Sequence, residues 1–126
     1  MSGKILIVDD DVDFVEAIKT LLETKNYEVF SAENGSEGFN QAKDNKPDLI
    51  ILDVMMATKT EGFDIARKLQ KESSTKGTPV IMITGIRKEM SLPFGFELNE
   101  DFLPVKAVLE KPIKPEVLLK KIEENI

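Results

Sequence analysis

Three short runs of continuous apolar residues constrain the fold of this chain more than any other feature. The runs are KILIV (4–8), DLIIL (48–52) and PVIMI (79–83). A strand that is buried on both faces has this composition, whereas a strand with one wet face alternates apolar and polar residues. The runs therefore predict parallel strands in the middle of a sheet. Two weaker runs, YEVFSA (27–32) and KAVLE (106–110), predict two further strands.

Helical patterns lie between and after these strands, with apolar residues repeating at spacings of three and four. The residues that form these patterns are Val12, Val15, Ile18 and Leu22; Phe39 and Ala42; Phe63, Ala66 and Leu69; and Leu118, Ile122 and Ile126. Asp11 and Asp13 suit the start of the first helix, and Pro115 suits the first turn of the last one. Alternating strands and helices predict an α/β fold with a doubly wound, five-stranded parallel sheet between two helical layers.

The segment 84–105, TGIRKEMSLPFGFELNEDFLPV, departs from this alternation. A helix belongs between the fourth and fifth strands, but Pro93, Gly95 and Pro104 interrupt it. We expect a long irregular connection there, with a short helical turn near 99–103.

Composition removes several classes of chemistry. The 126 residues suit one domain, and the absence of cysteine and histidine removes disulfides, thiolate sites and imidazole chemistry. The net charge of −6 and the lack of a basic stripe along the sequence argue against direct binding of DNA or RNA. No apolar stretch approaches the ~20 residues of a membrane span. The opening residues do not form a signal-peptide pattern, so we expect a cytoplasmic protein.

Polar residues follow the predicted strands at the point where each one ends. Asp9 and Asp10 follow the first run, Asp53 follows DLIIL, Thr84 follows PVIMI and Lys111 follows KAVLE. In an open parallel sheet the carboxyl ends of the strands form the edge at which ligands bind. We therefore expect these five side chains to form one site.

Such a site suits phosphoryl transfer. Carboxylates held close together repel one another unless a cation lies between them. Oxygen ligands without nitrogen favour a hard ion, and Mg²⁺ fits best because it accepts one or two carboxylates together with a phosphate oxygen. A hydroxyl and an ammonium nearby would stabilise phosphoryl oxygens. The pattern thus indicates a carboxylate nucleophile that needs no histidine of its own.

The motifs ILIVDDD, DLIILDVMM, VIMITG and LEKPIKP resemble, in this order, the receiver domain of bacterial response regulators. The resemblance covers the whole chain, 1–126, as a single CheY-like domain. It implies a flavodoxin-like fold with strand order 2-1-3-4-5. It also implies a signalling role in a two-component phosphorelay, and a protein that takes part only in its own phosphorylation and dephosphorylation rather than acting as an enzyme on other substrates.

The resemblance assigns roles to individual residues. Asp53 would accept a phosphoryl group from the phosphohistidine of a sensor histidine kinase or a phosphotransfer protein. Asp10 would bind Mg²⁺ directly, Asp9 largely through water, and the backbone carbonyl of Met55 would be a further ligand.

Two more residues would contact the phosphoryl group itself. Thr84 would donate a hydrogen bond to it, and Lys111 would pair with its charge. The phosphorylated state would alter a surface that an output protein or domain recognises, and a homodimer is an expected form of this family.

Two features depart from the family pattern. Val108 stands where an aromatic residue usually changes rotamer with phosphorylation, and the connection before it is longer than usual. We therefore hypothesise an output surface of a different kind, built from 86–105 with its three phenylalanines, Phe94, Phe96 and Phe102.

Other functions stay open on the sequence. A pseudo-receiver would use the same fold as a phosphorylation-independent protein-binding module, and Val108 favours it. A Mg²⁺-dependent aspartyl hydrolase of the haloacid-dehalogenase kind would carry a second aspartate where this chain has Met55. A flavodoxin-like electron carrier would need a hydroxyl- and glycine-rich loop where this chain has aspartates.

Overall fold

The computed structural model describes residues 3–53, 61–84, 107–110 and 113–126. Its elements in chain order are β1 (Lys4–Val8), α1 (Val12–Glu23), β2 (Glu28–Ala32), α2 (Gly35–Asn45), β3 (Leu49–Asp53), α3 (Glu61–Lys71), β4 (Val80–Thr84), β5 (Ala107–Glu110) and α4 (Pro115–Asn125). The strands form one parallel sheet in the order β2-β1-β3-β4-β5. This confirms the predicted flavodoxin-like topology. Among the described helices, none combines the length and the apolar character needed to cross a bilayer.

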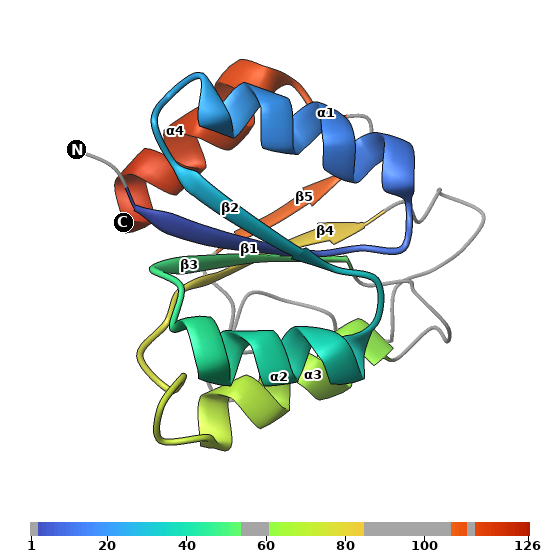
Figure 1. The fold of residues 1–126 in the computed structure, drawn as a ribbon, viewed down its shortest axis with the longest axis vertical. Helices are drawn as coiled ribbons and strands as arrows, with labels where there is room; N and C mark the ends of the chain where they lie inside the picture. The colour runs from blue at the N-terminus through green and yellow to red at the C-terminus, as the bar shows by residue number, and fades with distance from the viewer. Residues whose placement is uncertain (1–2, 54–60, 85–106, 111–112) are drawn as a thin grey trace.

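The sheet lies between two helical layers, as Figure 1 shows. Helices α1 and α4 cover one face, where Leu22 and Ile122 pack with Ile7. Helices α2 and α3 cover the other face, where Ala42 and Leu69 pack with the alternate residues of the strands. Successive side chains of a strand point to opposite faces, so a strand with helices on both sides must be apolar throughout. The continuous apolar runs of the sequence have this structural cause.

Two residues of the helical patterns lie outside the core. Val12 is 60% exposed, because it is the first residue of α1 and borders the edge of the sheet instead of its face. Ile126 is 49% exposed, because it follows the last residue of α4; its side chain lies near Gly3. The irregular connection expected at 84–105 lies, apart from Thr84, outside the described residues.

The starts of α1 and α4 follow their sequence signals. Asp11 is the N-cap of α1, and its carboxylate accepts a hydrogen bond from the Phe14 amide at 3.2 Å. Asp13 lies in the first turn of that helix, and Pro115 opens α4, as predicted. Asp11 comes two residues after Asp9, so the turn that begins α1 also holds Asp9 and Asp10 at the edge of the sheet.

The cap of α2 gives a stability prediction. Asn34 has extended backbone, and its side-chain oxygen accepts a hydrogen bond from the Glu37 amide at 2.8 Å. Asn34→Ala leaves that amide without its partner, so we expect the free energy of unfolding to fall by about 1 kcal/mol. Urea denaturation measures the change. Asn34→Asp, which keeps the acceptor, should stay close to the parent protein, and equal stability of the alanine variant would contradict the capping role.

Candidate functional site

Strand register brings two aspartates to the same level of the sheet edge. Val8 of β1 pairs with Leu52 of β3, and in a parallel pair the next residues of both strands, Asp9 and Asp53, advance together. Asp53 is the last residue of β3 and pairs in turn with Ile83 of β4. The neighbouring strands β1 and β3 therefore each place one carboxylate at the same edge of the sheet.

Asp9, Asp10 and Asp53 form a carboxylate cluster, in which one oxygen of each side chain lies within 4.8 Å of the others. Asp9 and Asp53 are buried, whereas Asp10 is exposed. Two buried anions beside a third repel one another strongly unless a cation neutralises them. The structure thus brings together the three side chains that the sequence selected as metal ligands.

Backbone contacts hold Asp9 in place. Its amide continues the ladder by donating to the Ala32 carbonyl at 3.0 Å, and its carboxylate accepts from the Asp11 amide at 2.9 Å. Asp11 itself points its carboxylate to the cap of α1. In this run of acidic residues, the cap and the cluster therefore use different aspartates.

The other predicted site residues are placed only by their backbone or not at all. Thr84 ends β4 and pairs in register with Glu110, the last residue of β5. Lys111 follows Glu110 in the sequence but lies outside the described residues, as does Met55. The assignment of these three residues to the site stays a prediction.

The donor set fits a hard divalent cation. Carboxylate oxygens from the ends of two strands and from the turn between β1 and α1 supply the ligands that Mg²⁺ prefers. The exposure of Asp10 leaves one side of the cluster open to water. Mg²⁺ retains several water molecules when it binds a protein, so an open, three-carboxylate edge suits it better than a closed cage does.

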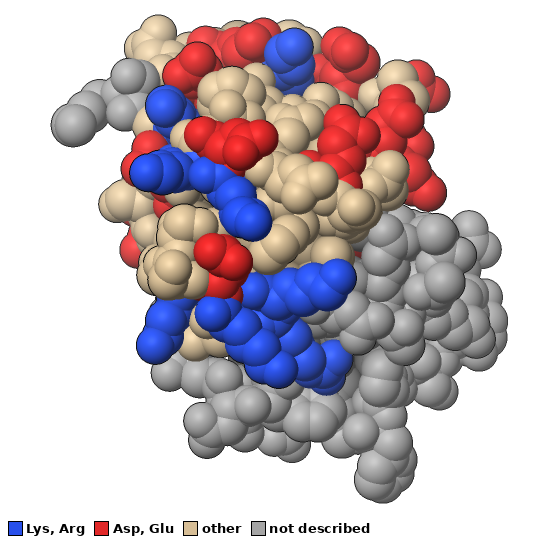
Figure 2. Space-filling view, turned by 60° about the horizontal axis from the view of Figure 1, so that its bottom comes forward, with Lys and Arg blue, Asp and Glu red and all other residues tan. Residues whose placement is uncertain are grey.

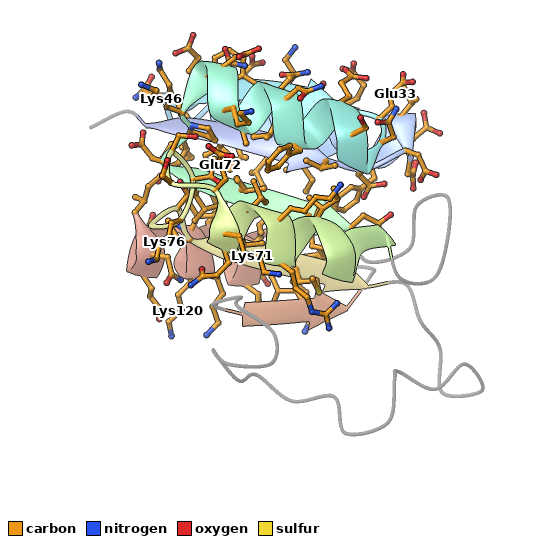
Figure 3. All side chains as sticks on the ribbon, turned by 90° about the horizontal axis from the view of Figure 1, so that it is seen from below. Glu33, Lys46, Lys71, Glu72, Lys76 and Lys120 are labelled. Carbon is orange, nitrogen blue, oxygen red and sulfur yellow. The ribbon has the colours of Figure 1, made fainter. Side chains whose placement is uncertain are left out.

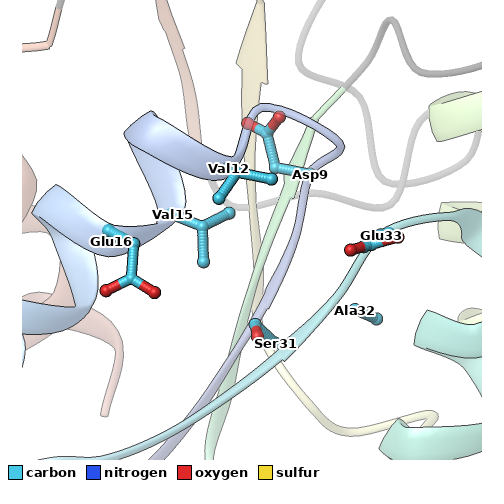
Figure 4. A pocket seen from close by; sticks show the side chains of 7 residues that line it. All are labelled: Asp9, Val12, Val15, Glu16, Ser31, Ala32 and Glu33. Atoms are coloured by element: carbon cyan, nitrogen blue, oxygen red, sulfur yellow. The ribbon is translucent and has the colours of Figure 1, made fainter.

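A pocket that the sequence did not indicate lies next to the cluster. It has a volume of about 150 Å³ and lies between the start of α1 and the end of β2 (Figure 4). Its lining residues are Asp9, Val12, Val15, Glu16, Ser31, Ala32 and Glu33. The exposed Val12 found in place of a core residue belongs to this wall. Helical spacing cannot distinguish the first turn of a helix from the turns that cover the sheet, so no sequence signal could have indicated this pocket.

Comparison with known proteins identifies the family. Residues 5–123 match the model of the response regulator receiver domain. The chain belongs to the response regulator receiver family. PilH of Pseudomonas aeruginosa is 34% identical to this receiver domain over 120 residues, which are 95% of this chain and 94% of PilH. The alkaline phosphatase synthesis transcriptional regulatory protein PhoP of Bacillus subtilis is 34% identical over 91% of this chain.

Solved structures of receivers share the fold of this domain. The chemotaxis protein CheY4 of Vibrio cholerae superposes with a TM-score of 0.85 at 29% identity, and each chain is covered completely. A CheY-like receiver domain protein of Methanospirillum hungatei superposes with a TM-score of 0.81 at 30% identity over 98% of this chain and 93% of the other. The receiver domain spans about half of the first transcriptional regulators it matches, 45% of PhoP and 52% of PhoB of Pseudomonas aeruginosa.

Proposed function

We propose that this receiver domain accepts a phosphoryl group on Asp53 in a Mg²⁺-dependent reaction and thereby signals to an output partner. The observation that carries the proposal is the meeting of Asp9, Asp10 and Asp53 at the carboxyl edge of the sheet, one of them at the end of a central strand. Of the four classes of function considered above, the receiver is the one that uses all three carboxylates at this edge.

Asp53 is the nucleophile in this proposal. A carboxylate oxygen of Asp53 forms a bond to phosphorus while the bond from phosphorus to the donor's leaving group breaks. The rigid end of β3 fixes the nucleophile, since the strand is paired on both sides. Bound Mg²⁺ supplies the positive charge that lets an anionic carboxylate approach an anionic phosphoryl group.

The remaining residues hold the reactants. Asp10 would hold Mg²⁺ directly and Asp9 through water, and the Met55 carbonyl would add a ligand. Thr84 donates a hydrogen bond to the phosphoryl oxygens, and Lys111 neutralises their charge. The domain changes only its own phosphorylation state, so it acts as a signalling protein and not as an enzyme on other substrates.

The partners follow from the family. A sensor histidine kinase or a phosphotransfer protein delivers the phosphoryl group, and an output protein or domain reads the result. Relatives of about twice the length are named transcriptional regulatory proteins, so regulation of transcription is one output that such a domain could serve. The residues of 86–105 and Val108 remain our proposed source of the altered surface.

Thermal stability with a phosphoryl mimic tests the proposal. Beryllofluoride and Mg²⁺ together should raise the melting temperature of the wild-type domain, because a ligand that binds only the folded state stabilises it. Neither reagent alone should give the full rise. Asp53→Asn should remove the rise, whereas Asp44→Asn, which also removes one negative charge but from the exposed surface of α2, should keep it.

The absence of a rise in melting temperature would contradict the proposal. If the mimic shifts neither the wild type nor its control, the carboxylate cluster does not accept a phosphoryl group. The domain would then be a pseudo-receiver, a binding module that works irrespective of phosphorylation.

A further inference from the structure

Basic side chains gather on one part of the surface, away from the carboxylate cluster. Figure 2 shows them collected below an acidic region, and Figure 3 places Lys46, Lys71 and Lys76 toward one end of the molecule and Glu33 toward the other. We call Lys46, Lys68, Lys71 and Lys76 the lysine face. All four are exposed. Between Lys71 and Lys76 the sequence has one acidic residue, Glu72, which is half-buried.

The fold assembles the lysine face from separate elements. Lys46 is the C-cap of α2, Lys68 and Lys71 lie in the last turn of α3, and α2 packs beside α3. The loop after α3 is held by buried Thr75, whose hydroxyl donates to the Leu69 carbonyl at 2.7 Å. This contact keeps the following lysine next to the end of α3. The fold therefore brings together, in one basic surface, lysines that are separated in the sequence.

Helix ends do not account for all four lysines. Cations near a helix C-terminus stabilise it through the helix dipole, which suits Lys46, Lys68 and Lys71. Lys76 lies beyond the end of α3 and has no such role. Within the described part of the chain, none of the four forms an ion pair with an acidic side chain. In a domain of net charge −6, this leaves a concentrated and available positive surface.

Among possible ligands, a short run of carboxylates suits the lysine face best. A nucleic acid duplex would extend past the four lysines and meet exposed acidic residues of α2, such as Glu37 and Asp44. The face also holds no exposed arginine or aromatic side chain to read bases. A membrane surface would require apolar side chains to insert, and the large exposed ones of the described residues, Val12, Val117 and Ile126, lie elsewhere. A short acidic peptide, in contrast, can bind within the area of the four lysines.

We propose that the lysine face docks a short acidic segment of a partner protein. Lys46 and Lys76 precede β3 and β4, whereas the carboxylate cluster follows β1 and β3, so the two surfaces lie at opposite ends of the strands. Strands of five residues extend about 16 Å, which exceeds the Debye length of about 8 Å at physiological salt. The docked segment therefore leaves the carboxylate cluster accessible.

Fluorescence anisotropy with a labelled oligoglutamate peptide tests this docking, with no Mg²⁺ or phosphoryl donor present. We expect saturable binding that weakens as NaCl is raised. Lys71→Gln/Lys76→Gln should weaken binding about fivefold, since each exposed pair contributes a fraction of a kcal/mol. Lys25→Gln/Lys114→Gln removes the same charge from exposed positions on other elements and should bind like the wild type.

Three results would overturn the proposal. The first is no saturable binding by the folded wild type, and the second is equal weakening by both double variants. The third is tighter binding of a DNA duplex of similar charge, which would make the face a nucleic-acid surface. Because the assay needs neither phosphorylation nor metal, failure here is distinct from failure of the phosphoryl-acceptor function.

Discussion

Asp10→Asn is expected to weaken Mg²⁺ binding by about tenfold or more, the loss that follows when a metal's ligand environment is disturbed. The reason is local: Asp10 brings its carboxylate to within 4.8 Å of those of Asp9 and Asp53, and it is the exposed member of the three. An asparagine oxygen can still coordinate but carries no charge, so affinity falls without disappearing. Isothermal titration calorimetry measures the change directly.

The neighbouring aspartate provides a matched control. Asp11→Asn removes the same negative charge one residue away, and asparagine preserves the N-cap acceptor of α1. If the cluster binds the ion through specific ligands, Asp11→Asn should retain most of the affinity. Equal losses in the two variants would show that only the general negative potential of this edge attracts Mg²⁺.

Gly38→Ala is expected to destabilise the domain by about 1–3 kcal/mol, the cost of inserting a methyl group into a close-packed core. Gly38 lies in α2 where the helix meets β1, and a Cβ there would come within 2.7 Å and 2.8 Å of the two Val8 methyl groups. Helix propensity alone predicts the opposite sign, because alanine is favoured over glycine by about 1 kcal/mol in a helix. Urea denaturation therefore decides between propensity and packing.

Two further variants make the glycine prediction specific. Gly77→Ala meets no atom within 4 Å and should leave stability nearly unchanged. Val8→Ala removes both methyl groups that the new Cβ would meet, so Gly38→Ala should cost less in that background than in the wild type. A stabilising effect of Gly38→Ala in the wild type would contradict the close approach of α2 to β1.

The sequence predicted those features that depend on local pattern. Continuous apolar runs such as DLIIL identified the buried parallel strands, and the position of Asp9 and Asp53 after two of these runs was enough to predict that they meet. Strand order came from the resemblance to receivers and is confirmed by the pairing of the five strands. Helix starts followed from short-range capping rules, as at Asp11.

Features that depend on distances between elements could not be predicted. The tight fit of Gly38 on Val8 depends on how closely α2 approaches the sheet, and the lysine face depends on which helix ends lie side by side. Val12 belongs to the predicted helical repeat but is exposed, because periodicity assigns a helix face and does not reveal where the sheet beneath it ends. The roles of Thr84 and Lys111 remain predictions from sequence.

The most direct test of the central claim is the intact mass of the protein after incubation with Mg²⁺ and acetyl phosphate. Acetyl phosphate is a small donor, so the result does not depend on knowing the kinase. We predict a gain of one phosphoryl group in the wild type, no gain when a chelator removes Mg²⁺, and no gain in Asp53→Asn. An unchanged wild-type mass, or a gain that persists in Asp53→Asn, would contradict the assignment of Asp53 as the phosphoryl acceptor.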